Sequence, residues 1–273
     1  MNKRLILIGL LCFLSGCASA IKKEDIILQA QHIKASVPPR FPVLVPTYFP
    51  FSDQEKLTYK AKYLGITIGQ FIIINNGKTM FKGREAYRFE LIVKTLPFFA
   101  KIFNTKDRYV SYMDRHLFVL RHEEYVKGGT VLESAFDFDY ENHIASYKNF
   151  TDQREEKVAI PDKILDVLSG GFYLRMISWQ LGDTVELKIY ADGKIYDFIG
   201  LLHSKKAINL PPYGKQEVYS LRPYAFLNEE PIKQISAEVF LSTTLPRKPM
   251  RAVLKSVWGN VSVILVEGLD DEN

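Results

Sequence analysis

The side chains that most often perform catalysis are scattered in this sequence. The five histidines stand at positions 32, 116, 122, 143 and 203, and no HExxH, HxH or Cys/His cluster joins them. We therefore predict no metal site and no cofactor. Ser169, in Leu168-Ser-Gly-Gly171, resembles half of a nucleophile elbow, but no Gly-x-Ser-x-Gly is present. A helix-capping or packing role explains this serine equally well, and we predict no catalytic residue.

Charged side chains could form a binding site instead. His122 and Glu124 share one face of a predicted strand, although solvated charges on a surface strand are the commoner case. A wider group would meet on the concave face of a sheet that curls: Asp107, Arg108, Arg121, Glu123, Asp139 and Arg175, with Tyr173 nearby on a helix. These residues could bind a polar ligand of the cell envelope, or they could form a structural network of salt bridges along the rim.

Paired carboxylates are a further possibility. Glu123 and Asp139 could hydrolyse or transfer cell-wall glycan or peptide, provided that they face each other across a cleft. Glycosidases need a separation of roughly 5 to 9.5 Å between two such groups.

The first 20 residues predict export. Lys3 and Arg4 precede an apolar stretch from Leu5 to Leu14, and small residues follow it. A charged start, an apolar run and a small-residue cleavage zone are typical of a secretory signal peptide. A transmembrane helix is the alternative, but it needs about 20 apolar residues and this run is shorter.

Leu14-Ser15-Gly16-Cys17 resembles the lipobox of bacterial lipoproteins. The resemblance implies lipidation of Cys17, cleavage before it, and acylation of the new amino terminus with a fatty acid such as palmitate. Each buried CH₂ contributes about 0.8 kcal/mol, so several chains hold a protein firmly on a membrane. Ala18 stands where an Asp would favour the inner membrane of Gram-negative bacteria. We therefore expect a lipid-anchored protein of the cell envelope, at the outer membrane and facing the periplasm.

Composition narrows the remaining chain to a globular, β-rich protein. Of its 273 residues, 47% are hydrophobic and 13% aromatic. The net charge is +5 and falls to about +3 without Lys3 and Arg4, which is too small to indicate a nucleic-acid partner. The two cysteines are Cys12 and Cys17, so the expected mature domain has neither a disulfide nor a free thiol.

Alternating apolar and polar residues predict antiparallel strands with one buried face. The alternation is clear over residues 57–63, 87–93, 136–140 and 185–189. Hairpin turns are predicted at Asn75-Asn76-Gly77, Lys127-Gly128-Gly129 and Asp192-Gly193. We expect about a dozen strands in one mainly-β domain, arranged as a single, strongly curved, half-barrel or barrel-like sheet.

One helix is expected as an insertion between strands of this domain, from Asp162 to Trp179, with Asp162 as its N-cap. Gly170-Gly171 in its middle is unfavourable and could divide it into two. The segment 96–103 is too apolar for a loop and is expected to be a short helix or an exposed apolar flap.

The segment before the sheet is expected to be a tether. Residues 21–36 could form a short helix, and residues 37–50 contain five prolines. Such a segment forms a semi-rigid spacer, or its aromatic residues pack along the folded body; both interpretations stay open. The expected organisation is a signal peptide (1–16), a lipidated N-terminus and Pro-rich tether (17–51), the mainly-β domain (52–268) and an acidic tail (269–273).

Short motifs along the whole domain resemble a bacterial exported family, the domain of unknown function 3108. They are Glu55-Lys-Leu-Thr-Tyr59, Gly83-Arg-Glu-Ala-Tyr87, Asp107-Arg-Tyr109, Arg121 with Glu123 and Glu124, Phe138-Asp-Tyr140, Asp166-Val-Leu-Ser169, Tyr173-Leu-Arg175, Leu181-Gly-Asp183 and Val239-Phe-Leu-Ser242. The loop at Leu210-Pro-Pro-Tyr-Gly214 departs from the family's pattern. The resemblance implies a curved, mostly antiparallel sheet without a known cofactor, and it assigns no activity.

The leading functional expectation is a non-enzymatic binding or assembly module of the cell envelope. Its aromatic-rich curved sheet would bind an apolar or amphipathic partner, such as a lipid, an acylated glycan or a protein segment. The alternatives are the carboxylate-dependent hydrolase or transferase and a structural protein that pairs through an exposed strand edge.

Overall fold

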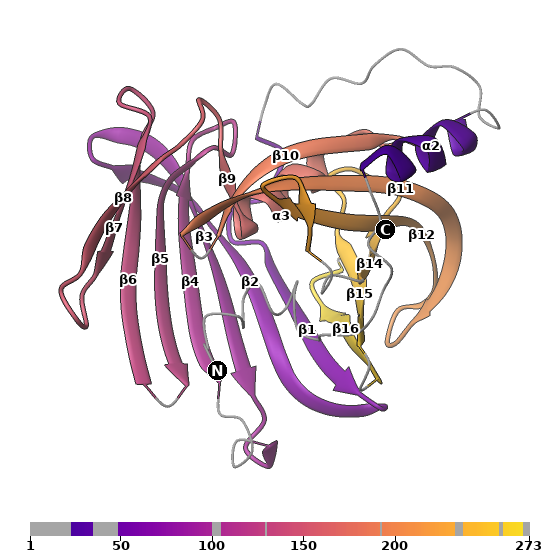
Figure 1. Ribbon diagram of the computed structural model, residues 1–273. Coiled ribbons are helices and arrows are strands. Elements are labelled where there is room, and N and C mark those ends of the chain that lie inside the picture. The colour runs from indigo at the N-terminus through magenta and orange to yellow at the C-terminus, as the bar shows by residue number, and fades with distance from the viewer. Residues whose placement is uncertain are drawn as a thin grey trace.

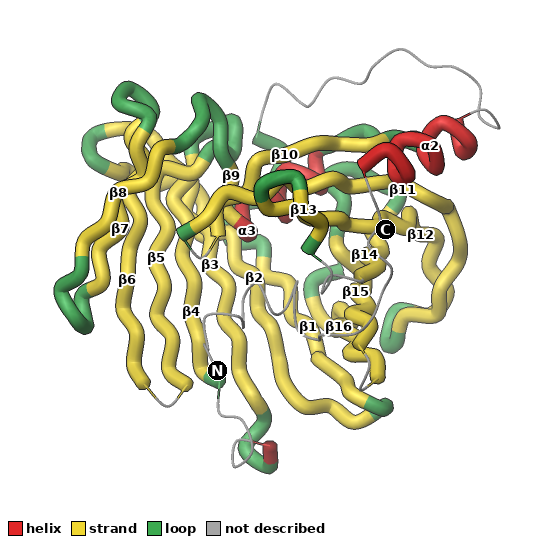
Figure 2. Tube along the Cα trace, viewed as in Figure 1, coloured by secondary structure: helices red, strands yellow, loops and turns green. Residues whose placement is uncertain are grey.

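The computed structural model describes residues 23–34, 49–99, 105–128, 130–191, 193–232, 237–256 and 259–269. One curved sheet of sixteen strands dominates it (Figures 1 and 2). The predicted mainly-β, strongly curved antiparallel sheet is confirmed, with more strands than the dozen expected. The sheet is not closed into a barrel, because its two edge strands, β8 and β9, do not pair with each other.

The chain builds the sheet as two meanders. The first is β1 (Lys56–Tyr63), β2 (Ile66–Phe81), β3 (Arg84–Thr95), β4 (Lys106–Met113), β5 (Val119–Gly128), β6 (Thr130–Asp139), β7 (Ile144–Asn149) and β8 (Glu155–Ala159). The second is β9 (Leu165–Asp166), β10 (Thr184–Ala191), β11 (Lys194–Leu210), β12 (Gly214–Leu227), β14 (Ala237–Ser242), β15 (Pro249–Ser256) and β16 (Gly259–Glu267), with β13 (Glu230–Pro231) beside β12. The meanders join at the centre of the sheet, where β1 pairs antiparallel with β16.

The β9 edge is tucked against the concave face of the first meander. β9 pairs in parallel with β10, and the backbone N–H of Val119, at the start of β5, donates to the carbonyl of Ile164 at 3.4 Å. The Tyr140 hydroxyl donates to the carbonyls of Val119 and Ile164 at 2.8 and 3.2 Å. The sheet is therefore rolled, and one backbone hydrogen bond together with side-chain contacts, without a strand ladder, connects the β9 edge to the first meander.

Helix α3 (Val167–Met176) follows β9 directly and lies against the concave face. Leu168 and Phe172 pack with Phe51, Phe89 and Met113 in one apolar cluster. The helix is shorter than predicted, and its N-cap is Asp166 instead of Asp162. The physical reason is the pairing of Leu165 and Asp166 with β10, which keeps the chain extended up to that point. Gly170 and Gly171 both lie inside one continuous helix.

A second helix, α2 (Lys23–Lys34), lies in the segment expected to be the lipidated N-terminus and tether. Its Ile26 is fully buried against Ile199, Leu201 and Phe226, and Figure 1 shows the helix beside β11. The Pro-rich segment up to residue 48 lies outside the described residues. Phe49 stacks on Tyr87, with 3.7 Å between ring centroids. Aromatic packing along the body is thus confirmed for Phe49, and the packed domain begins before residue 52.

Two local predictions need correction or completion. Asn75-Asn76-Gly77 is not a hairpin turn but a bulge within the long strand β2, where the pairing with β3 shifts register. The Asn75 side chain causes this by donating to the Ser52 carbonyl at 2.7 Å and accepting from the Gly77 N–H at 3.0 Å. At the other two predicted turns β5 pairs with β6 and β10 with β11 as hairpins, while Gly129 and Asp192 themselves lie outside the described residues. In the apolar segment 96–103, Phe98 is exposed, and residues 100–104 lie outside the described part.

Candidate functional site

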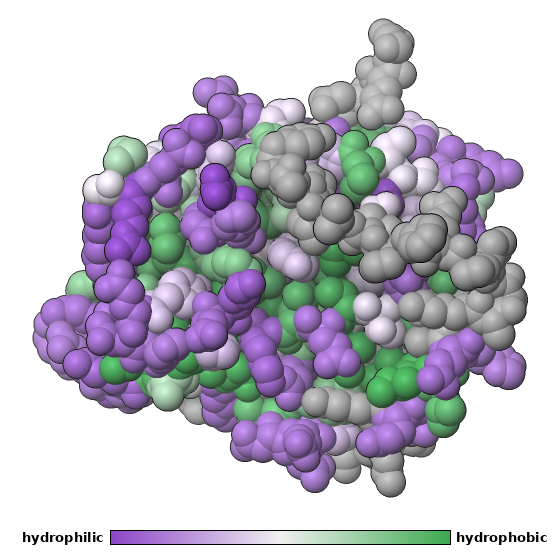
Figure 3. All heavy atoms as spheres, turned by 90° about the horizontal axis from the view of Figure 1, so that it is seen from above, coloured by the Kyte–Doolittle hydropathy of each residue, from purple (hydrophilic) through white to green (hydrophobic). Residues whose placement is uncertain are grey.

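An apolar cavity of about 220 Å³ lies between helix α3 and the concave face of the sheet. Strands β1 to β4 supply one wall, β15 and β16 another, and α3 the cover. Its lining residues are Leu57, Tyr59, Phe71, Ile73, Leu91, Tyr109, Val167, Leu168, Gly171, Phe172, Arg175, Pro249, Arg251, Ala252 and Val263. Seen from above in Figure 3, apolar side chains gather in the middle of the molecule and hydrophilic ones ring them.

Tyr59 brings a polar atom into this apolar lining. Its side chain is 4% exposed, and its hydroxyl oxygen is buried without a hydrogen-bond partner among the described residues. Burial raises the pKa of the Tyr59 hydroxyl, which therefore remains a neutral donor. An unsatisfied buried hydroxyl costs about 1–3 kcal/mol, so the folded protein gains nothing from it.

Gly171 is the exposed member of the lining and lies at the mouth of the cavity. A Cβ atom added there would meet no atom within 4 Å, so no packing constraint requires glycine. Glycine inside a helix costs about 1 kcal/mol relative to alanine. Gly170 differs, because a Cβ there would lie 2.8 Å from the Cδ1 of Ile189.

Arg175 fixes the C-terminal end of α3. The side chain is 2% exposed, and its guanidinium forms a bidentate pair with Glu55 at 2.8 and 2.6 Å. Its Nε donates to the Arg247 carbonyl at 2.6 Å, and the rings of Phe51 and Phe172 lie 4.5 and 4.8 Å from the guanidinium carbon. Each of the three guanidinium nitrogens donates one hydrogen bond, so this residue acts as a structural clamp.

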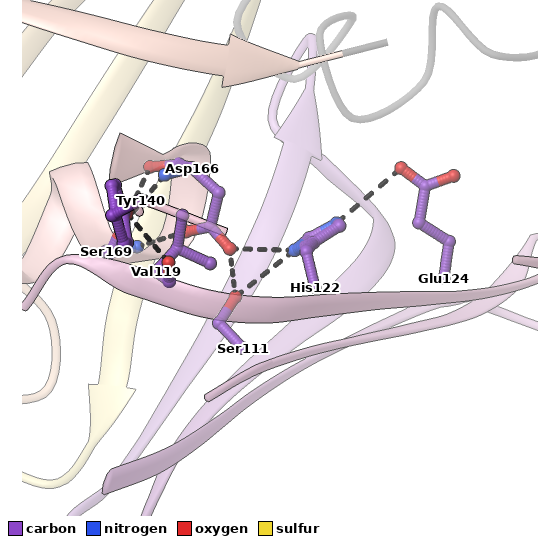
Figure 4. A network of polar contacts seen from close by, with 7 residues as sticks. All are labelled: Ser111, Val119, His122, Glu124, Tyr140, Asp166 and Ser169. Carbon is purple, nitrogen blue, oxygen red and sulfur yellow. Dashed lines mark hydrogen bonds and ion pairs between the residues drawn. The ribbon is translucent and has the colours of Figure 1, made fainter. Parts of the chain in front are cut away.

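The N-terminal end of α3 is fixed by a buried polar network (Figure 4). Asp166 accepts from the Ser169 N–H at 2.6 Å, and the Ser169 hydroxyl accepts from the Asp166 N–H at 2.8 Å, which together form a capping box. The other oxygen of Asp166 contacts Nδ1 of His122 at 2.8 Å and accepts from the Ser111 hydroxyl. Ser111 and His122 belong to β4 and β5, so the network ties the tucked edge of the sheet to the first meander.

The network holds a buried ion pair. Burial disfavours the charged imidazolium, but the hydrogen bonds that His122 donates to the carboxylates of Asp166 and Glu124, the latter 3.5 Å from Nε2, outweigh burial and raise the pKa of His122 to about 10. Burial likewise opposes the Asp166 carboxylate, yet His122, Ser111 and the Ser169 N–H hold its pKa below the usual range. At neutral pH the histidine is a cation between two carboxylates.

Serine, histidine and aspartate meet here without the geometry of a catalytic triad. In a triad the serine and the aspartate contact different ring nitrogens of the histidine. Ser111 and Asp166 instead share Nδ1, and Glu124 faces Nε2. Ser111 is fully buried and away from the cavity, so a substrate cannot reach its hydroxyl. Ser169, the half-elbow serine, has the capping role that explains it without catalysis: it is the third residue of the helix and completes the capping box with the N-cap Asp166.

The structure separates the charged residues that the sequence grouped together. Arg108 pairs with Glu90 at 2.6 Å, and Arg121 pairs with Glu123 and Asp137 at 2.7 and 2.9 Å. These side chains lie on the strand face opposite to Asp107, because neighbouring residues of a strand point to opposite faces. Asp107 is 1% exposed and accepts from the Lys127 N–H at 3.0 Å.

The other members of that group are also apart. Asp139 accepts from the N–H groups of Glu141 and Asn142 in the exposed β6–β7 turn. Tyr173 is half-buried on α3, and of the group Arg175 alone lines the cavity. The expected single concave patch is therefore not formed. His122 and Glu124 also differ from solvated surface charges, since His122 is 5% exposed and points inward.

A polar cleft of about 950 Å³ adjoins the Arg175–Glu55 pair, with Arg175 lining the apolar cavity and Glu55 lining the cleft. Its polar lining combines hydroxyl and amide side chains with charged ones of both signs: Ser52, Gln54, Gln216, Ser242, Thr243 and Thr244, and Asp53, Glu55, Lys56, Glu217 and Lys248. In the described part of the chain, no three His, Cys, Asp or Glu side chains are grouped to hold a metal ion. No helix within the described ranges is long and apolar enough to cross a bilayer.

Comparison with known proteins identifies the fold and a family. The family model described as "Protein of unknown function (DUF3108)" matches residues 58–266. A similar solved structure is the "Beta-barrel-like Protein of Domain of Unknown Function DUF1849 from Brucella abortus", with a TM-score of 0.52 and 7% identity. The match covers 78% of this chain and 95% of that chain, and at this identity it concerns the fold alone. No curated protein matches the sequence.

Proposed function

Because this chain belongs to the DUF3108 family of proteins of unknown function, its relatives assign it no activity, and we propose one from its own residues. The proposal is a lipid-anchored, non-enzymatic protein of the cell envelope that binds the apolar part of a lipid, acylated glycan or protein segment between α3 and the sheet. Export and anchoring through Cys17 rest on residues 1–20, which lie outside the described structure.

The observation that carries the proposal is the apolar cavity with the unpaired Tyr59 hydroxyl. Engineered apolar cavities of about 150 Å³ stay dry and bind benzene, so about 220 Å³ accommodates a somewhat larger hydrocarbon group. A ligand with an oxygen acceptor near its apolar end would fill the volume and satisfy Tyr59.

The neighbouring cleft favours an amphipathic ligand. The hydroxyl, amide and lysine groups of the cleft suit a polar head with oxygen atoms, while the cavity suits a hydrocarbon tail. The Arg175–Glu55 clamp lies between the two spaces and keeps α3 in place as a fixed cover. In this proposal the ligand enters at the exposed mouth beside Gly171, without unfolding of the helix.

The alternative functions lack a supporting observation. Glu123 and Asp139 lie on adjacent strands and four residues apart along them, which separates their backbones by roughly 14 Å. That separation exceeds what a carboxylate pair requires. For pairing through an edge, β8 is five residues long and mostly exposed, with Glu155, Glu156 and Lys157 side by side. Short, charged edge strands are a device that prevents pairing with another chain.

Two substitutions test the proposal, and each should weaken ligand binding without lowering the stability of the protein. Gly171→Leu fills the cavity mouth and improves helix propensity, and Tyr59→Phe removes the unpaired hydroxyl without changing the packed volume. Both variants should be as stable as the parent or more stable, yet bind octanoic acid more weakly in isothermal titration calorimetry. Native mass spectrometry of the protein purified from membranes should show a bound amphipathic molecule that Gly171→Leu lacks.

Tyr140→Phe is the matched control. Tyr140 lies outside the cavity lining, and its hydroxyl donates to two backbone carbonyls. This variant should lose about 1 kcal/mol of stability per lost bond and keep its affinity for octanoic acid. Equal octanoic acid binding by the parent and Gly171→Leu, or a parent protein that binds none and carries no ligand, would refute the proposed function.

A further inference from the structure

Large apolar side chains are exposed together at one end of the first meander. Leu64 in the β1–β2 turn is 72% exposed, and Ile66 at the start of β2 is 60% exposed. Phe98, beyond the end of β3, is 80% exposed, and Val131, beside the β5–β6 turn, is 54% exposed. Adjacent antiparallel strands bring these segments to the same end of the sheet, the lower edge in Figure 1. We call these four residues the apolar rim. Several large apolar side chains exposed at one end of a sheet are typical of an interaction surface.

Leu64 is a costly residue for its turn. It has φ of 48° and Gly65 has φ of 82°, so both central residues of the two-residue hairpin turn are left-handed. Asn, Asp and Gly are preferred in such a turn, and a bulky residue is strained there. The exposed leucine side chain offers no packing within the folded chain in return. A binding role for this side chain accounts for its presence.

A row of lysines crosses the sheet just behind the apolar rim. Lys60 on β1 pairs with Gln70 on β2, which pairs with Lys94 on β3, and Lys94 pairs with Lys106 on β4. Lys127 on β5 pairs with Val131 of the apolar rim. The four lysines are exposed, and in the described ranges none has an ion-pair partner. Four strand spacings separate Lys60 from Lys127, or roughly 19 Å along the sheet.

The opposite end of the same strands differs in charge. There Lys78 pairs with Glu85 at 3.3 Å, and Arg84 pairs with Glu141 at 3.4 Å. Positive and negative groups neutralise each other at that end. At the rim end, the four lysines, which have no ion-pair partner in the described part of the chain, outnumber the nearby exposed Glu133 and leave a net positive charge behind the apolar side chains.

We propose that the apolar rim and its lysine row dock the domain onto a lipid bilayer that carries anionic headgroups. Leu64, Ile66 and Phe98 enter the interface between headgroups and acyl chains, and the lysines contact the negative surface. Four residues of strand separate Lys60 from the turn tip, or roughly 13 Å, which places its ammonium within about one Debye length of the headgroups. Apolar insertion with flanking basic residues is the physical basis of interfacial membrane binding. This inference is independent of any ligand in the cavity.

Vesicle sedimentation of the chain from residue 18 onward tests the proposal, because this form has neither the apolar stretch Leu5–Leu14 nor the lipid anchor at Cys17. The vesicles are phosphatidylcholine alone or an equal mixture of phosphatidylcholine and phosphatidylglycerol. We expect preferential binding to the anionic mixture. Lys60→Gln combined with Lys94→Gln should weaken binding to the anionic mixture alone, by roughly fivefold per lysine at low salt.

Leu64→Asn is the most informative variant. Loss of one inserted leucine should lower the partition coefficient by about tenfold or more on both kinds of vesicle. Because asparagine suits the turn, the melting temperature should stay the same or rise, which excludes unfolding as the cause. Met80→Asn is the matched control: Met80 is 66% exposed on β2 but near the opposite end, so its replacement should leave vesicle binding unchanged.

Two results would overturn the proposal. Binding that does not depend on phosphatidylglycerol would exclude a role for the lysine row. Equal vesicle binding by the parent and Leu64→Asn would mean that the apolar rim does not touch lipid, as expected if it serves a protein partner instead.

Discussion

Asp166→Asn tests whether the buried network holds helix α3 and the tucked edge of the sheet in place. Asparagine is also a good N-cap, so the hydrogen bond from the Ser169 N–H can survive and the capping contribution changes little. What disappears is the negative charge 2.8 Å from Nδ1 of His122. Removing one partner of a buried ion pair costs about 3–5 kcal/mol, because the remaining charge stays buried without compensation. We expect a loss of this size near pH 6.

The pH dependence follows from the two shifted pKa values. The pKa of His122 is raised to about 10 in the folded state and is about 6.5 in the unfolded chain, so the folded state binds the extra proton between these values. This contribution is fully present below about pH 6.5 and decreases as the pH rises toward 10, by at most about 1.4 kcal/mol per pH unit. The lowered pKa of Asp166 contributes stability that is present above about pH 4 and is lost as the pH falls.

The measurement is urea unfolding of the parent and Asp166→Asn from pH 4 to pH 10. The stability difference should be largest between about pH 4 and 6.5 and should narrow above that range, since the variant has less histidine stabilisation to lose. Asp162→Asn is the matched control, because Asp162 contacts His143 at 3.2 Å in an exposed pair that contributes at most about 1 kcal/mol. Parallel pH curves for the parent and Asp166→Asn, or a loss below 1 kcal/mol, would refute the reasoning.

Two further predictions concern the other end of α3 and the membrane anchor. Arg175→Met leaves Glu55 without its partner and should cost about 3–5 kcal/mol of stability in thermal or urea unfolding. Adding Glu55→Gln should restore part of the lost stability. No recovery in the double variant would contradict a charge-based clamp. Cys17→Ala should abolish metabolic labelling with palmitate and release the protein from membranes or leave it uncleaved. Persistent labelling would show that Cys17 is not the lipidated residue.

Strand faces could be predicted from the sequence because the two-residue period is a local signal. This two-residue period does not show where a strand ends in a turn, because a tertiary contact can keep the chain extended through residues that favour a turn. Asn75-Asn76-Gly77 has good turn residues, but Asn75 bonds to Ser52 and the strand continues for six more residues. The start of α3 differs from the prediction for a similar reason. Both Asp162 and Asp166 can cap a helix, and the pairing of Leu165 with β10 keeps the chain extended up to Asp166.

The candidate site could be predicted much less well, because its parts are distant in sequence. Glu55 and Arg175 are separated by 120 residues, and Ser111 and Asp166 by 55. One signal was readable: Asp166 and Ser169 have the spacing of a capping box. The inward direction of Ser111 also follows from strand parity with Tyr109, whereas that of His122 depends on the register with Phe136 on the next strand. The identity of their partner, however, depends on how the sheet rolls, and no local pattern contains that information.

The central position of the β1–β16 pairing has a consequence for how the chain folds. Each meander consists of neighbours in sequence and can form hairpin by hairpin, with low contact order. The pairing of β1 with β16 joins residues about 200 positions apart, so its formation carries the loop-closure entropy of the longest loop in the domain. If the chain crosses a membrane N-terminus first, β1 to β8 can assemble early, but one side of β1 stays unpaired until the last strand arrives. Until β16 arrives, the unpaired edge of β1 can pair with a wrong strand. A chaperone that covers β1 would act during this interval.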